Sequence, residues 1–162
     1  MFTHRVISFL TSQALTVLRL AFILLLTAAV PAWAATHTVT NSNDSGAGSL
    51  RAQIATAATG DTIVFDAALD GATISLTTFV NDLTTGSKQF GPSAFFITGS
   101  QALTIDATAN GLTKGIVIAR SSAAGTANFR LFDVGVGSSL TLRGVTLSNG
   151  YVRGGSSLYA GG

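Results

Sequence analysis

The sequence predicts an all-β protein, and three observations support this prediction. Short runs such as 72–77 and 103–107 alternate apolar and polar residues, which is typical of strands. All 18 glycines follow residue 34, which indicates many turns. The 7 acidic residues are all aspartates, and the chain is rich in Thr, Ser, Val and Ile, which favours strands and turns over helices.

Residues 1–34 have the pattern of a secretory signal peptide. A positively charged front precedes an apolar core at 20–30, and Ala32-Trp33-Ala34 has the small-x-small pattern of a signal-peptidase site. We therefore expect cleavage before Ala35, export through the inner membrane, and an extracellular or cell-surface location. The alternative is a membrane anchor, but Arg19 and a proline interrupt that span and its uninterrupted apolar part is short for a bilayer.

Composition excludes several classes of protein. Cleavage would remove two of the 9 basic residues, so that 9 − 2 = 7 would face 7 acidic ones. A chain of about zero net charge is not expected to bind nucleic acid or an anionic membrane. The absence of cysteine excludes disulfides, thiolate metal sites and a lipoprotein anchor.

The segment 39–65 predicts a strand, a turn, a short helix, a second turn and a second strand. Residues 43–46 are turn formers, and Ser49 is a good candidate for a helix N-cap. The helix would carry one apolar stripe, and Gly60 would follow its end. The stripe consists of Leu50, Ile54, Ala57 and Ala58.

This segment resembles the N-terminal cap of secreted bacterial right-handed parallel β-helix proteins, of the surface-protein and autotransporter-passenger type. Their cap has the pattern Asp-x-Gly-x-Gly-Ser-Leu-Arg, a short helix, and then Gly-Asp-Thr-Ile. The matching cap residues are Asp44, Gly46, Gly48, Ser49, Leu50, Arg51, Gly60 and Asp61, followed by Thr62 and Ile63. The helix departs from the family pattern, because Ala52-Gln53-Ile54 stands where Gln-Ala-Ile is expected. The resemblance implies a cap at 35–66 and β-helix coils at 67–162.

The remaining chain predicts short strands separated by small-residue turns, and a loop at 79–92. The predicted strands are 72–77, 94–98, 103–107, 115–119, 129–134, 139–142 and 145–147. The repeat-like run 139–150 suits stacked coils, although no period can be assigned. An antiparallel β-sandwich is the alternative fold, because Asn110-Gly111 between two strands is a hairpin signal. Because the sequence stops where another coil would begin, we expect a fragment of a longer solenoid.

No catalytic, cofactor or metal site is predicted. A calcium-binding nonapeptide, an EF-hand loop, a Gly-x-Ser-x-Gly motif and a phosphate loop are all missing. Asn43-Asp44-Ser45 suits a turn better than a cation site, and a lone His37 is expected to be solvated. Arg51 is mildly unfavourable in a first helix turn, so we expect a tertiary partner, either Asp61 or a backbone carbonyl, that locks the cap to the first coil.

The expected function is that of a non-catalytic, adhesin-like surface protein that contacts a glycan or a cell-surface protein. The alternative is a fragment of a carbohydrate-active β-helix enzyme, either a lyase or a hydrolase. Its candidate acids and bases would be Asp66, Asp70, Asp106, Asp133, Arg120, Arg130 and Arg143. Against this, Asp66 and Asp70 fit a turn, while Asp106 and Asp133 fit solvent-facing strand positions. An even, Thr/Ser-rich surface would favour the first function; exposed aromatics beside an Asp/Arg cleft would favour the second.

Overall fold

The computed structural model describes residues 33–80 and 91–152. The chain divides into a unit at Met1–Trp33 and a second unit at Ala34–Gly162, and the elements below belong to the second. Most of the predicted signal peptide, the centre of the predicted loop 79–92 and the chain end from residue 153 lie outside the described residues.

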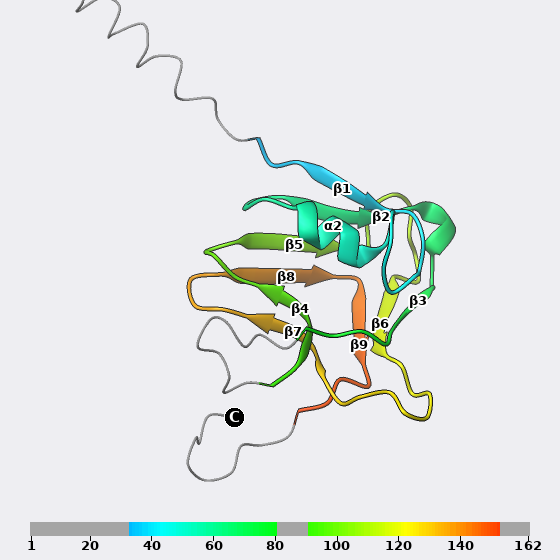
Figure 1. The fold of residues 1–162 in the computed structure, drawn as a ribbon. Coiled ribbons are helices and arrows are strands. Elements are labelled where there is room, and N and C mark those ends of the chain that lie inside the picture. Colours follow the sequence, from blue (N-terminus) through cyan, green and yellow to red (C-terminus); the bar gives the residue numbers. More distant parts are fainter. Residues whose placement is uncertain (1–32, 81–90, 153–162) are drawn as a thin grey trace, which may run out of the picture. The chain divides into compact units, whose positions relative to one another are not determined.

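The described chain is mostly β-structure, with one short α-helix and one 3₁₀ helix. Figure 1 shows the strands with their labels. The elements are β1 (Thr36–Val39), α2 (Leu50–Thr56), β2 (Thr62–Phe65), η1 (Ala67–Leu69), β3 (Thr73–Leu76), β4 (Ser93–Ile97), β5 (Ala102–Asp106), β6 (Ile116–Arg120), β7 (Arg130–Val134), β8 (Ser139–Arg143) and β9 (Val145–Ser148). Each predicted strand is present with ends shifted by at most a few residues; the 3₁₀ helix η1 occupies a stretch that has turn character in the sequence.

The strands form three sheets, in the orders β1-β2-β5-β8, β3-β6-β9 and β4-β7. From β2 onward, the chain visits the first, second and third sheet in strict rotation. All six strand pairs are parallel. The alternative prediction of an antiparallel sandwich is therefore wrong for the described residues. Asn110 and Gly111 do form a turn with positive φ, but the turn joins β5 in one sheet to β6 in another.

Like side chains stack across the sheets because the strands pair in register. Ile63 lies opposite Ile105, and Ile105 opposite Leu142. Phe95 pairs with Phe132, and their ring centroids are 5.1 Å apart. These columns form one apolar core, in which full burial of each large side chain contributes about 2 kcal/mol.

The helix α2 packs beside β1, the first strand of the four-stranded sheet, and covers the core there. Leu50 is fully buried, and Ile54 and Ala57 pack against the core cluster. Ala58 is exposed, so the predicted apolar stripe is one residue shorter than expected. The helix ends at Thr56 with Ala57 as its C-cap, and Gly60 instead occupies the turn before β2, with a φ of 91°.

Candidate functional site

The loop between β1 and α2 depends on a glycine at position 48. The carbonyl of Gly48 accepts from the backbone N–H of Thr40 at 2.9 Å. Gly48 has a φ of 75°, and a Cβ on it would overlap the Thr40 hydroxyl and lie 2.7 Å from Nδ2 of Asn41. Only glycine meets both demands, since other residues are strained at positive φ. The close contact of Gly48 with Thr40 and Asn41 lets the chain turn back after β1 and enter the helix.

Ser49 is the N-cap of α2, as predicted. Its hydroxyl accepts from the N–H of Ala52 at 3.2 Å and donates to the carbonyl of Gly46 at 2.7 Å. Ser49 is fully buried, and these two hydrogen bonds satisfy its hydroxyl. The cap thus joins the start of the helix to the turn in front of it.

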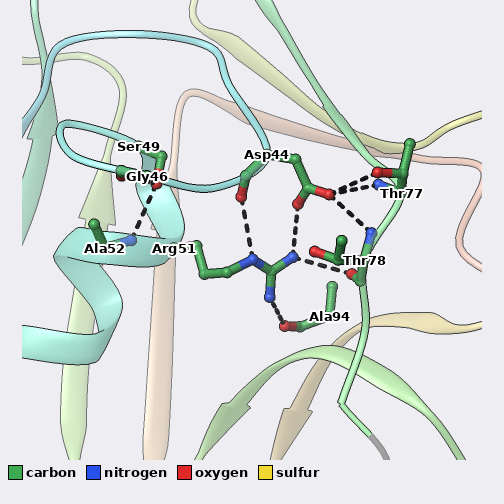
Figure 2. A network of polar contacts seen from close by, with 8 residues as sticks. All are labelled: Asp44, Gly46, Ser49, Arg51, Ala52, Thr77, Thr78 and Ala94. Atoms are coloured by element: carbon green, nitrogen blue, oxygen red, sulfur yellow. Dashed lines mark hydrogen bonds and ion pairs between the residues drawn. The ribbon is translucent and has the colours of Figure 1, made fainter.

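Arg51 is the centre of the polar network in Figure 2. Its Nε donates to the carbonyl of Asp44 at 3.1 Å, and its Nη2 contacts Oδ1 of the same residue at 2.7 Å. The guanidinium also donates to the carbonyls of Thr78 at 3.0 Å and Ala94 at 2.6 Å. It lies 4.9 Å from the centre of the Phe95 ring, within range of a cation–π contact. One side chain therefore joins the loop between β1 and α2, the segment that follows β3, and strand β4.

Asp44 completes this network from the other side. Its Oδ2 accepts from the N–H and hydroxyl of Thr77, both at 2.9 Å, and from the N–H of Thr78 at 2.8 Å. Burial alone would raise the pKa of Asp44, but the hydrogen bonds from Arg51, Thr77 and Thr78 lower it to about 2. The network therefore holds Asp44 as a carboxylate.

The predicted Arg51–Asp61 pair is not formed, whereas the predicted backbone carbonyl partners are. Asp61 instead contacts Nε2 of His37 at 2.8 Å and accepts from the N–H groups of Ala35 at 2.7 Å and Ala58 at 2.8 Å. His37 is half-buried, so the expectation of a solvated histidine is wrong. The hydrogen bonds from His37, Ala58 and Ala35 lower the pKa of Asp61 to about 2. Because the carboxylate can only accept, Nε2 of His37 carries the proton in this contact.

The two acids proposed for an enzyme site near η1 each hold a turn. Asp66 accepts from the N–H of Ala68 and caps η1. Asp70 accepts from the N–H and hydroxyl of Thr113 and from the N–H of Lys114. The hydrogen bond from the Lys114 N–H is the largest cause of the lowered pKa of Asp70. Both carboxylates thus fasten the loops that connect neighbouring strands.

The other candidate acids and bases are also engaged in local contacts. Asp106 lies 3.6 Å from Arg143, its partner in the next strand, and Asp133 lies 3.3 Å from Arg130. Arg120 donates to three backbone carbonyls. Within 33–80 and 91–152, no three acidic or histidine side chains are grouped so that they could hold a metal ion.

Comparisons with protein-family models, curated proteins and solved structures return no significant match, so function has to be inferred from the fold and its contacts. Among the described helices, none is both long and apolar enough to cross a membrane.

The lowered pKa values of Asp44 and Asp61 predict a loss of stability in acid. Both pKa values, for Asp44 and Asp61, fall from 3.8 to about 2 on folding. A depressed folded pKa stabilises the protein above the unfolded value, and this contribution is lost as pH falls from about 4 to about 2. We expect urea midpoints to drop over this range, and to drop less steeply in Asp44→Asn. An equal slope in both proteins would contradict the prediction.

Proposed function

We propose that this chain is the N-terminal cap and first coils of a secreted right-handed parallel β-helix protein, of the surface or autotransporter-passenger type. The observation that carries the proposal is the strict rotation of the chain through three parallel sheets, with like residues stacked in register. Each turn of such a rotation is one coil. Crossover connections between parallel strands are nearly always right-handed, which favours that hand for the coils.

The outer face of the first sheet favours a binding role over a catalytic one. Four threonines stand in register on β1, β2, β5 and β8, next to the inward-facing Ile63 and Ile105. They are Thr36, Thr62, Thr104 and Thr141. Neighbouring strands lie about 4.8 Å apart, so the hydroxyls form an evenly spaced column of donors and acceptors. Such a column suits the hydroxyl groups of a glycan or the edge of a surface protein.

The contacts of the acidic residues support the same choice. A glycan-cleaving enzyme needs a carboxyl group free to donate or accept a proton beside the substrate. The candidates Asp70 and Asp106 have pKa values below the ordinary range, and both hold neighbouring loop residues. Tightly bonded, low-pKa carboxylates are poor general acids near neutral pH. We therefore propose a non-catalytic, adhesin-like role at the cell surface.

Further coils are the second proposed partner. Strands β8 and β9 are edge strands of their sheets within the described chain. Leu147 on β9 continues the column of Ile74 and Ile118, yet it is 46% exposed where those two are buried. An edge with free backbone groups and an exposed apolar column favours pairing with another parallel strand.

The test is binding and cleavage of glycans by the full chain after export from a bacterial host. We expect retention on one class of immobilised glycan or surface protein, without release of new reducing ends. Release of new ends from a polysaccharide would support the enzyme alternative instead.

Two matched variants locate the binding face. Thr141 and Thr146 are both exposed strand threonines, but on different sheets. Thr141→Lys interrupts the threonine column and should reduce retention at least tenfold, whereas Thr146→Lys should leave it unchanged. Equal retention by the two variants would refute a binding role for the column.

A further inference from the structure

The buried carboxylate of Asp61 is hydrogen-bonded to the backbone at the predicted signal-peptidase cleavage site. Asp61 is 4% exposed, and its Oδ1 accepts from the N–H of Ala35 at 2.7 Å. The carbonyl of Ala35 in turn accepts from the N–H of Thr62 at 2.9 Å. Ala35 is thus held on both sides one residue before β1 begins, although its own side chain is exposed. This arrangement fixes the position of one backbone nitrogen against one carboxylate oxygen.

That nitrogen belongs to the peptide bond that a signal peptidase is expected to cut. Ala32-Trp33-Ala34 places the scissile bond between Ala34 and Ala35. Trp33 is 85% exposed, and Ala34 is also exposed. Hydrolysis breaks the bond between the Ala34 carbonyl carbon and the Ala35 nitrogen. Water supplies the hydroxyl of the new Ala34 carboxylic acid and a proton to the Ala35 amine, which binds a further proton at neutral pH.

We propose that Asp61 is the receptor for the α-ammonium group that cleavage creates at Ala35, so that processing itself completes the N-terminal cap. The proposal rests on the proposed export of the chain. Before cleavage, Asp61 receives a neutral amide N–H; after cleavage, the same nitrogen carries a full positive charge. An amide N–H on a carboxylate is already a charge-assisted hydrogen bond, and a charged donor adds the attraction between two opposite charges. Cleavage therefore replaces a hydrogen bond from a neutral donor with an ion pair at a buried carboxylate.

The surroundings of Asp61 suit this role. His37 on β1 is the titratable side chain that acts on its carboxylate in the described chain, and Ala58 supplies a neutral N–H. The carboxylate stays ionised well below neutral pH, since its pKa is about 2. An ammonium facing an ionised carboxylate is held protonated, which raises the pKa of the α-amino group above its ordinary value. A raised pKa contributes stability that is fully present below the unfolded value, near pH 8, and is lost as pH rises through the folded value.

The experiment uses the full chain, exported and processed by a bacterial host. Intact mass and N-terminal sequencing should show Ala35 as the first residue. A second sample is acetylated selectively at the α-amino group near neutral pH, where the lysine amines are protonated. Acetylation keeps an N–H for Asp61 but removes the charge. We expect the acetylated protein to melt about 4 °C lower at pH 7, and the difference to disappear well above pH 9.

Two further measurements separate the possible outcomes. Asp61→Asn should melt at the same temperature with and without acetylation, because the carboxylate is gone. If this variant does not fold, an NMR titration of the wild-type α-amino group decides, with a pKa raised by about one unit expected. Cleavage elsewhere, or no cleavage, would overturn the proposed processing. Cleavage at Ala35 with equal melting temperatures and an ordinary α-amino pKa would overturn the role of Asp61 and leave export standing.

Discussion

Replacement of Arg51 by alanine is expected to lower the free energy of unfolding by about 3 kcal/mol. The change removes the charged donor of three backbone carbonyls, those of Asp44, Thr78 and Ala94, and the partner of the Asp44 carboxylate. Hydrogen bonds to charged groups contribute about 1.5–3 kcal/mol each, but bonds that share one side chain are not additive. The Arg51 side chain is 22% exposed, so water replaces part of the loss. Urea unfolding of wild type and variant at pH 7 measures the difference.

Arg143 provides a matched control for this prediction. It is also an arginine paired with an aspartate, Asp106, but its side chain is 63% exposed and the distance is 3.6 Å. Exposed pairs contribute about 0.5 kcal/mol, so Arg143→Ala should change stability by no more than that. Arg51→Lys should recover less than half of the loss, because a lysine cannot reproduce the planar set of donors. Similar losses in Arg51→Ala and Arg143→Ala would contradict a locking role for Arg51.

The local parts of the cap could be predicted from the sequence because short-range rules decide them. Ser49 stands before a helix-forming run, and its hydroxyl caps the helix as expected. The sequence also indicates that Arg51 needs a tertiary partner, since a cation opposes the helix dipole there. Asp44 is a nearby partner, but the other two, Thr78 and Ala94, lie far along the chain, and only the folded sheets place them beside the helix.

The contacts of Asp61, in contrast, could not be predicted from the sequence. The sequence predicts a tertiary partner for Arg51, and Asp61 is one of the two candidates, beside a backbone carbonyl. In the folded chain, the parallel pairing of β1 with β2 brings Ala35 and His37 to Asp61 instead. A strand register cannot be deduced from the residues of one strand alone. For the same reason, a histidine that is solitary in the sequence acquires a buried partner.

The period of the repeat cannot be predicted from the sequence because the connections between strands differ in length. The stacked residues Ile63, Ile105 and Leu142 are separated by 42 and 37 positions. In the second sheet, Ile74, Ile118 and Leu147 are separated by 44 and 29 positions. The loops absorb these differences while the strands stay in register, so no fixed spacing appears in the sequence. The strands are predictable, whereas their stacking is not.

Substitution of Gly115 by alanine is the second change with a large expected effect, a loss of about 3 kcal/mol in the free energy of unfolding. Gly71, Gly115 and Gly144 precede β3, β6 and β9, so they occupy the same corner in three successive turns of the chain. The N–H of Gly71 donates to the carbonyl of Gly115 at 2.8 Å, and that of Ile116 to the carbonyl of Gly144 at 3.0 Å. Gly115 has a φ of 68°, and a Cβ on it would overlap the Gly144 carbonyl oxygen. Because that neighbour is backbone, relief requires the two turns to move apart.

Substitution of Gly125 by alanine is the control that distinguishes strain at positive φ from overlap with the next turn of the chain. It has a φ of 85°, but a Cβ there would meet nothing within 4 Å. Gly125→Ala therefore carries only the strain of positive φ, about 1 kcal/mol, whereas Gly115→Ala adds the overlap with the next turn, about 2 kcal/mol more. Urea unfolding of both variants measures the difference directly. Equal losses would mean that the backbone at Gly115 and Gly144 can move apart without loss of stability, and that the two turns are not tightly packed there. A larger loss in Gly115→Ala than in Gly125→Ala would mean that backbone contact between successive turns, in addition to the side chains of the core, holds the sheets in register.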